Sequence, residues 1–473
     1  MSVLRQAVFA SLVCILCMNV GYIYSWPSST LRLFASTNTT LNRPMTETEQ
    51  ALFGSLSSIA SLISTPFAGF LLDTLGRKYS CILFAIPQII GWIIVSTCYT
   101  VEGILAAMFI SGLGGCIFII APVFICEFCQ ETIRGMMTTG VIVYYGIGML
   151  LSYLLGGSLE YNMLNYTCLS LTTLGCSLAW FLKESPIVLM RRGLEKEAAE
   201  SISYYRGVKI NSKEVMQEID TIRKALNPDL EVEHVPDEAT DEDVLKVPVK
   251  PEKLNFWQFF KKSQSTRRAL LLCLVLYTAS IFQGLVVVQV YAQPLFEEAV
   301  PNVSTTLSSV IFAIVLIVSG CIAAFFIDKA GRRPLIIYSS ITAGICCAVL
   351  GTQIQYHWGP HWVSAILLYS YCIAYSLGAG TVPYVIVAEV FLPEIKSIVS
   401  VITVEWAWTC NFIILFIFNP LVTTLGLGGI FYIFAVVCFL TAVYCVFYLP
   451  ETKGLTVDVI QTRFVKKINT GDA

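Results

Sequence analysis

Two short charged stretches of the chain are near-copies of one another. Residues 72–80 read LDTLGRKYS and residues 327–335 read IDKAGRRPL. An aspartate, a glycine and an arginine recur in the same order: Asp73, Gly76 and Arg77, then Asp328, Gly331 and Arg332. The glycine suits a tight turn with positive φ. The arginine can form a charge-assisted fork with a carboxylate, which holds two segments together and can release them again.

A glutamate and a cation are also repeated as a pair. Glu127 precedes Arg134 by seven residues, and Glu389 precedes Lys396 by the same distance. Seven residues make about two helical turns, so the two charges share one face if the helix continues. Further glutamates follow in KESP (183–186) and PETKG (450–454), so the charges recur twice in the same order.

We interpret these residues as one reversible structure, the cytoplasmic latch. Its predicted cations are Arg77, Arg134, Arg332, Arg333 and Lys396. Its predicted carboxylates are Glu127, Glu184, Glu389 and Glu451, accompanied by the loop residues Asp73 and Asp328. The alternative is that basic residues lie there only because membrane insertion retains them inside, which explains Lys466 and Lys467 well. That alternative does not explain a glutamate repeated at a fixed spacing from a cation, so we favour the latch.

Other chemistries find little support in the residue pattern. Most of the 17 cysteines lie inside apolar runs, where cysteine behaves as a small buried hydrophobe. The three histidines, His234, His357 and His361, lack the spacing of a metal site. No nucleophile–base pair or cofactor loop is apparent. We therefore expect no enzyme activity, no metal and no cofactor.

The composition indicates a chain that lies mostly in a lipid bilayer. Charged residues make up 13% of it, against about 25% in soluble domains. Apolar runs of about twenty residues can cross a bilayer as helices. Twelve such runs are predicted, near 6–26, 51–72, 79–98, 101–124, 138–159, 164–182, 269–292, 306–327, 334–354, 362–388, 398–420 and 428–449. The first could be a cleaved signal peptide, but its length favours an uncleaved span.

Charged residues concentrate between the sixth and seventh runs. Residues 183–268 hold 32 of them, so this segment must lie in water. The predicted domains are an N-terminal six-helix bundle (1–182), a cytoplasmic central segment (183–268), a C-terminal six-helix bundle (269–449) and a cytoplasmic tail (450–473). The expected fold class is an all-α membrane protein with twelve transmembrane helices in two six-helix pseudo-repeats, the major facilitator fold.

The distribution of lysine and arginine predicts the orientation. Outside the central segment, 12 of 14 fall on one side if both termini are cytoplasmic, as the positive-inside rule requires. Three glycosylation sequons then fall in outer loops, at Asn38, Asn165 and Asn302. These sequons favour the secretory route, and we expect a multi-pass protein of the plasma membrane.

The motifs DTLGRK, PVFICE…RG, ESP, DKAGRR, VPYVIVAE and PETKG resemble those of the sugar-porter branch of the major facilitator superfamily, over the whole chain. Within it, GYIYSWPSS, TETEQALFGSL and AAESISYYRG are similar to the insect trehalose-transporter-like group. The resemblance implies facilitative transport of a sugar, trehalose or hexose, by alternating access, and short helices in the central segment. It implies a small-molecule solute and the bilayer as partners, and no nucleic acid. Oligomeric state is left open, with a monomer plausible.

The substrate site is where the chain departs from that family. Polar family positions on helices 5, 7 and 8 read Ile142, Ser280, Ile281, Val286 and Leu316, and the helix 4 arginine is replaced by Met108. Each apolar replacement removes a hydrogen bond worth about 0.5–1.5 kcal/mol. The substrate-binding residues we predict are Gln283, Tyr291, Tyr384, Trp408 and Asn411. Interhelical packing is the alternative role for each.

Three alternative functions stay open. The altered positions could select a different small solute. Glu405 lies within the eleventh apolar run, and an intramembrane carboxylate suggests a proton-coupled symporter. Proton-coupled relatives instead carry an aspartate just after a Gly-Tyr pair, where this chain has Gly21, Tyr22 and Ile23. A non-transporting nutrient sensor on the same fold is the third. Sensors of that kind usually carry long signalling tails, whereas we expect short tails here.

Overall fold

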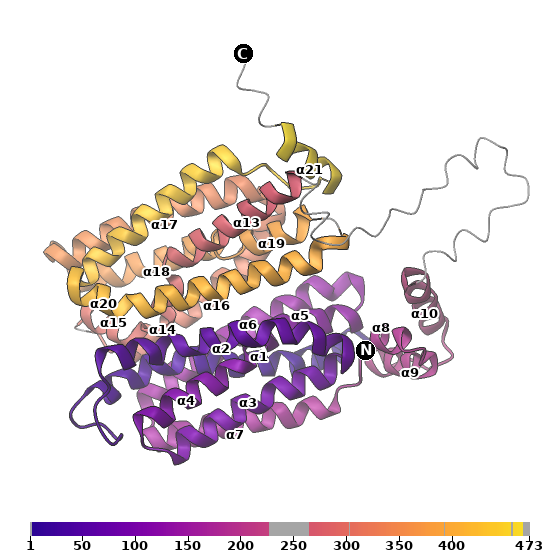
Figure 1. Cartoon of the computed structure of the whole chain (residues 1–473), viewed down its shortest axis with the longest axis horizontal. Helices are drawn as coiled ribbons and strands as arrows, with labels where there is room; N and C mark the ends of the chain where they lie inside the picture. Colours follow the sequence, from indigo (N-terminus) through magenta and orange to yellow (C-terminus); the bar gives the residue numbers. More distant parts are fainter. Residues whose placement is uncertain (1, 227–263, 302, 392, 456, 467–473) are drawn as a thin grey trace, which may run out of the picture.

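The computed structural model describes residues 2–226, 264–301, 303–391, 393–455 and 457–466. These residues form helices and no strand. Two helical bundles lie side by side (Figure 1), the N-terminal one in indigo to magenta and the C-terminal one in orange to yellow.

The N-terminal bundle contains six helical segments. They are α1 (Ser2–Ala35), α2 (Glu47–Thr74), α3 (Arg77–Thr97), α4 (Val101–Gly112) running through η1 (Leu113–Cys116) into α5 (Ile117–Phe128), α6 (Glu131–Ser158) and α7 (Tyr161–Leu178) with η2 (Ala179–Phe181). The side chains of Tyr22 and Trp26 are buried in the bundle, so α1 packs as an integral span.

The C-terminal bundle repeats this plan with more interruptions. Its helices are α13 (Gln264–Phe282), α14 (Leu285–Val290), α15 (Ala292–Ala299), α16 (Thr305–Ala330), α17 (Arg332–Tyr356), α18 (His361–Leu377), α19 (Val382–Val390), α20 (Pro393–Tyr448) and α21 (Val457–Lys466). The predicted seventh run therefore breaks, at Gly284, whose φ of 96° is left-handed and favours glycine.

The twelve predicted spans all have helical counterparts. Ten stretches of the described chain are long and apolar enough to cross a membrane. One of them, Ile398–Tyr448, is interrupted by the non-helical Gly426 and holds two of the predicted spans. The shorter α7 supplies the remaining one.

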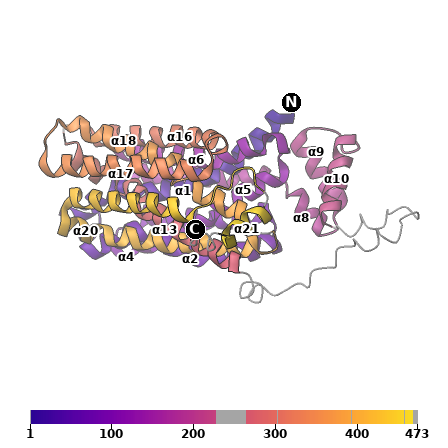
Figure 2. The same cartoon turned by 90° about the horizontal axis from the view of Figure 1, so that it is seen from above.

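Three short helices lie at one end of the molecule, beside the N-terminus (Figures 1 and 2). They are α8 (Pro186–Arg191), α9 (Glu195–Arg206) and α10 (Lys213–Leu226). α9 and α10 pack on each other through a small apolar cluster that includes Ile202, Val215 and Ile219. This end carries the repeated charged loops, which the distribution of lysine and arginine predicts to be cytoplasmic, so we name it the cytoplasmic end and the opposite one the outer end.

The apolar core is distributed unevenly between the two ends. One cluster joins the outer part of the N-terminal bundle, including Trp26, Phe53 and Tyr153, to the core of the C-terminal bundle. A second cluster, with Phe124 and Phe128, fills the cytoplasmic part of the N-terminal bundle. The buried core is thus continuous between the bundles at the outer end.

Candidate functional site

The arginine of the first repeated loop is held by a buried glutamate. Arg77 donates from Nε and Nη2 to Oε1 of Glu127, at 3.0 and 2.8 Å, and from Nη1 to the carbonyl of Leu72 at 2.8 Å. Both side chains are nearly enclosed, at 7% and 11% exposure. Asp73 lies 3.9 Å away and is mostly exposed, so Glu127 is the principal partner.

Glu184 caps the helix that begins in the same loop. Its Oε1 accepts hydrogen bonds from the backbone N–H groups of Arg77, at 2.8 Å, and Lys78, at 3.3 Å. Unpaired N–H groups and a positive dipole end make a helix N-terminus suited to a carboxylate. Gly76 has a φ of 95°, and a Cβ there would overlap the Glu184 carboxylate. Glycine is therefore required at position 76 for two reasons: the backbone has a positive φ, and the Glu184 carboxylate leaves no space for a side chain.

The second repeated loop has the same arrangement. Arg332 donates from Nε and Nη2 to Oε1 of Glu389, at 3.1 and 2.6 Å. Glu451 accepts from the backbone N–H groups of Arg332 and Arg333, each at 3.0 Å. Gly331 has a φ of 87°. The repeat seen in the sequence is therefore a repeat of three-dimensional contacts.

Backbone donors set the charge state of Glu451. Burial alone raises the pKa of this carboxyl group, but N–H groups of Lys453, Arg332, Arg333 and Thr452 outweigh burial and hold the pKa below its usual range. Glu451 therefore stays charged where it caps α17.

The described latch pairs close within a bundle and not between bundles. Arg77 pairs with Glu127, and Arg332 with Glu389. Nε of Arg134 and Nε of Arg333 are buried without a hydrogen-bond partner. The side chains of Asp328 and Lys396 lie outside the described residues. A latch that joins the two bundles stays a prediction.

Contacts between the bundles gather at the outer end instead. Arg32 of α1 forms an ion pair with Glu297 of α15. Ser28 Oγ accepts from the backbone N–H of Gln293 at 2.8 Å. The Tyr153 hydroxyl donates to the carbonyl of Gln289 at 2.5 Å. α14 and α15 thus rest on α1 and α6, at the end away from α8–α10 (Figure 1).

Tyr291 belongs to this outer closure. Its hydroxyl donates to the Leu415 carbonyl at 3.3 Å, and its ring stacks on Phe418 at 4.9 Å. A Cβ on Gly54 of α2 would overlap the Tyr291 hydroxyl. The closure therefore needs a glycine facing this tyrosine.

A polar and aromatic set lies between the bundles, nearer the middle of the helices. Tyr24 of α1 stacks on Trp408 of α20, with ring centroids 6.0 Å apart. The Tyr24 hydroxyl lies 3.2 Å from Ser61 Oγ, which donates to the carbonyl of Gly112. The hydroxyls of Tyr145 on α6 and Tyr384 on α19 are within electrostatic reach of one another. Both bundles therefore contribute to one set.

Three neighbouring residues in the first half of α20 each have a buried polar atom without a hydrogen-bond partner within the described structure. The atoms are Oε1 of Glu405, Nε1 of Trp408 and Oδ1 of Asn411. The residues follow one another at intervals of three, which places them along one side of the helix. Glu405 is within electrostatic reach of the Cys116 thiol in the N-terminal bundle. A buried polar atom without a partner can form a hydrogen bond with a ligand, and the position of these three between the bundles makes the stripe suited to a polar ligand.

The structure separates the predicted substrate residues into those that lie between the bundles and those that do not. Trp408 and Asn411 lie on the stripe, and Tyr384 is 56% exposed beside Tyr277. Gln283 does not join them, because it is enclosed within the C-terminal bundle, where Nε2 donates to Thr441 at 3.2 Å. Tyr24 and Cys116 were missed, since nothing in an apolar run marks the face that meets the other bundle.

The glycosylation predictions also divide. Asn38 is exposed in the loop after α1. Asn165 lies inside α7 with no exposed surface, so the prediction there is corrected: an enclosed amide in a helix cannot carry a glycan in the folded chain. Asn302 lies outside the described residues.

Comparison with known proteins gives one family. The model of a family described as "Sugar (and other) transporter" matches residues 17–464. The chain is 26% identical to the facilitated trehalose transporter Tret1 of Bombyx mori, covering 94% of this chain and 84% of the relative. It is 24% identical to that of Apis mellifera ligustica, covering 99% and 90%. It spans only 50% of trehalose transporter 1 of Drosophila melanogaster, at 24% identity.

Solved structures share the fold. The inward open conformation of the xylose transporter XylE from E. coli gives a TM-score of 0.77 at 18% identity, covering 97% of this chain and 99% of that one. The proton:xylose symporter XylE bound to 6-bromo-6-deoxy-D-glucose gives 0.70 at 20% identity, covering 98% of each. At these identities the likeness concerns the fold alone.

Proposed function

We propose that this chain, which belongs to the sugar (and other) transporter family, carries trehalose or a hexose across the plasma membrane by alternating access. It is a multi-pass membrane transporter of the major facilitator fold, and not an enzyme. The trehalose transporters among its relatives support the choice of sugar. The predicted cytoplasmic position of both termini belongs to the same proposal.

One observation carries the mechanism: the bundles are fastened at the outer end while the latch arginines pair within their own bundles. The Arg32–Glu297 ion pair and the Ser28–Gln293 hydrogen bond cross between bundles. This is the arrangement expected of a carrier that is closed to the outside. Opening outward breaks these contacts, and the latch residues then meet across the cytoplasmic end.

The proposed substrate site is the set between the bundles. The unpaired atoms of Trp408 and Asn411 offer one donor and one acceptor to sugar hydroxyls. The rings of Tyr24 and Tyr384 supply the apolar surface that a pyranose face requires. Because the set draws on both bundles, a bound solute would be released when the bundles rock apart. Tyr291 is assigned to the outer closure and Gln283 to the packing of the C-terminal bundle.

The test is uptake of labelled trehalose and glucose by cells expressing the chain. Saturable uptake is expected, with Trp408→Ala and Asn411→Ala each reducing it about tenfold or more, since each leaves a sugar hydroxyl unpaired. Gln283→Leu, in the packed interior of the same C-terminal bundle, is the matched control and should retain the apparent affinity. An Arg77→Ala/Arg332→Ala double variant should alter the maximal rate. Absence of uptake from surface-expressed protein would overturn the choice of sugar.

Glu405 favours a second candidate, proton-coupled transport. Its carboxylate lies in a membrane-spanning helix, with Oε1 buried and unpartnered in the described structure, and an ionisable group inside the membrane is a candidate for a proton relay. Uptake that rises at acidic external pH, and loses that dependence in Glu405→Gln, would support coupling. Uptake insensitive to external pH, with a neutral Glu405→Gln substitution, would leave facilitated diffusion as the mechanism.

A further inference from the structure

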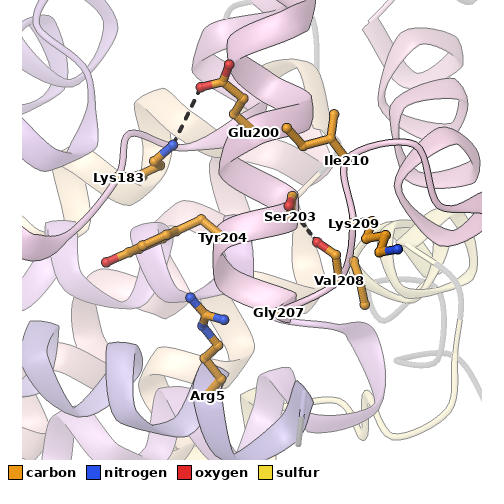
Figure 3. Close-up of a pocket in the computed structure, with 9 residues that line it drawn as sticks. All are labelled: Arg5, Lys183, Glu200, Ser203, Tyr204, Gly207, Val208, Lys209 and Ile210. Carbon is orange, nitrogen blue, oxygen red and sulfur yellow. Dashed lines mark hydrogen bonds and ion pairs between the residues drawn. The ribbon is translucent and has the colours of Figure 1, made fainter.

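A hollow at the cytoplasmic end gathers cations from three segments that are far apart in the chain. Arg5 comes from the first turns of α1, Lys183 follows η2, and Lys209 follows α9 (Figure 3). The hollow has a volume of about 470 Å³, enough for a headgroup-sized ligand. It lies outside the latch and far along the chain from the α20 stripe.

The ring of Tyr204 organises two of these cations. The guanidinium carbon of Arg5 lies 5.4 Å from the ring centroid, and Nζ of Lys183 lies 5.5 Å from it. The ring itself is fixed, because its hydroxyl donates to the Phe181 carbonyl at 2.9 Å and its face packs on Phe9. Two like charges are thus held beside one fixed ring, Lys183 on one side and Arg5 on the other (Figure 3), and anionic groups next to them would stabilise both.

The positive charge of the hollow is only partly balanced. Its one lining carboxylate, Glu200, lies 3.6 Å from Lys183, longer than a good hydrogen bond. Arg5 and Lys209 make no side-chain hydrogen bond or ion pair among the residues that the structure describes. The hollow therefore carries a net charge of about two positive units, which matches a phosphate monoester of −1.5 to −2 at neutral pH.

The surroundings indicate where such a phosphate comes from. Next to the hollow, Leu4 and Val8 of α1 and Trp180 and Phe181 of η2 leave large apolar surfaces exposed, at 72%, 52%, 60% and 65%. Exposed apolar side chains at a helix end face lipid, with aromatic rings at the headgroup level. A basic pocket beside them at the cytoplasmic leaflet is placed to meet acidic phospholipids.

We propose that this hollow binds the phosphate of an acidic phospholipid headgroup through Arg5, Lys183 and Lys209. The lipid would join α9 to the ends of the first and sixth spans. It would thereby fix the short cytoplasmic helices to the N-terminal bundle without touching the solute path.

The proposal is tested by thermal unfolding of the purified full chain in detergent. Short-chain phosphatidylinositol 4-phosphate is expected to raise Tm saturably, and short-chain phosphatidylcholine is not. Inositol 1,4-bisphosphate and inorganic phosphate separate the sources: a shift as large with either as with the lipid would overturn a lipid source and leave a soluble phosphate compound as the ligand. No shift with any of the four would overturn the phosphate site itself.

Matched variants locate the effect. Arg5→Ala/Lys209→Ala should weaken the apparent lipid affinity by about tenfold or more, because two charge-assisted contacts are lost. Lys196→Ala/Lys213→Ala removes the same charge from exposed positions of α9 and α10 and should leave the affinity unchanged. Glu200→Gln should strengthen binding, which protects the test against a variant that fails to fold. Equal lipid affinity in the two double variants would overturn the assignment of the phosphate site to this hollow.

Discussion

The two repeated loops fasten their arginines alike but treat the second oxygen of the partner glutamate differently. In the C-terminal bundle, Thr452 donates its hydroxyl to Oε2 of Glu389 at 2.6 Å. In the N-terminal bundle, the equivalent Ser185 hydroxyl and Oε2 of Glu127 are both buried without a hydrogen-bond partner in the described structure. Glu389 is also more exposed than Glu127, at 25% against 11%.

This difference teaches that a sequence repeat can conserve a charge pair while its support varies. In the N-terminal pair, Arg77 is the one side chain that stabilises the Glu127 carboxylate in the described structure. In the C-terminal pair, the Glu389 carboxylate also accepts a hydrogen bond from Thr452 and is more exposed to solvent. The N-terminal loop should therefore be the more sensitive to loss of its arginine. It also holds the unpaired Oε2 of Glu127, which we predict takes a new partner when the bundles rearrange.

The largest difference in stability between the two loops is expected when their arginines are replaced. Arg77→Ala leaves the buried Glu127 with no partner, and breaking a buried pair in this way costs about 3–5 kcal/mol. Arg332→Ala should cost less, because Glu389 keeps the Thr452 hydroxyl. Thermal unfolding in detergent measures both, with Lys196→Ala as an exposed control. Equal losses would show that the hydroxyl does not distinguish the loops.

The next largest loss of stability is expected from substitution of the loop glycines. Gly76→Ala and Gly331→Ala both force a side chain into the left-handed region, a strain of about 1–3 kcal/mol. A Cβ on Gly331 would lie 2.9 Å from the Glu451 carboxylate, and one on Gly76 would lie closer still to Glu184. Gly76→Ala should therefore lower Tm more. The reverse order would mean that Glu184 moves aside more readily than Glu451.

Removing the hydroxyl sharpens the comparison directly. Thr452→Val deletes the hydrogen bond to Glu389 and should destabilise by about 1.5 kcal/mol, typical for a bond to a charged group. Ser185→Ala deletes a hydroxyl that has no partner and should be close to neutral. The same unfolding measurement applies, and a Ser185→Ala loss as large as that of Thr452→Val would remove the asymmetry.

The smallest expected effect is the loss, at acidic pH, of the stability that the Glu451 carboxylate contributes. The pKa of Glu451 is lowered on folding by its backbone donors, so its contribution is present above the unfolded carboxyl pKa of about 4.3 and fades as pH falls through the lower folded value. The Tm difference between wild type and Glu451→Gln should thus be full at neutral pH and shrink in acid. A difference that grows in acid would contradict this sign.

The sequence predicted the charged residues better than their partners. Periodicity placed Arg77 and Glu127 at helix ends, and short range spacing suggested a common role. It could not show that the pair closes within one bundle, because partners 50 residues apart meet only through tertiary packing. Whether the latch ever joins the bundles depends on a second conformation.

It was harder to predict which face of each apolar helix meets the other bundle. α16 and α20 are apolar nearly all round, so no amphipathic pattern marks the side that meets the other bundle. Gln283 and Asn411 therefore looked equivalent in the sequence, although one is packed inside a bundle and the other lies on the α20 stripe. Asn165 failed for the same reason, since a sequon does not report burial.

The apolar cluster that joins the two bundles at the outer end has a thermal consequence. Outward opening must expose part of this buried surface, including rings such as Phe53, to external water. Exposure of apolar surface raises the heat capacity, so the balance between the two open states follows a curved temperature dependence. Cooling weakens the hydrophobic attraction, so the contribution of this cluster to closing the outer end decreases in a colder membrane.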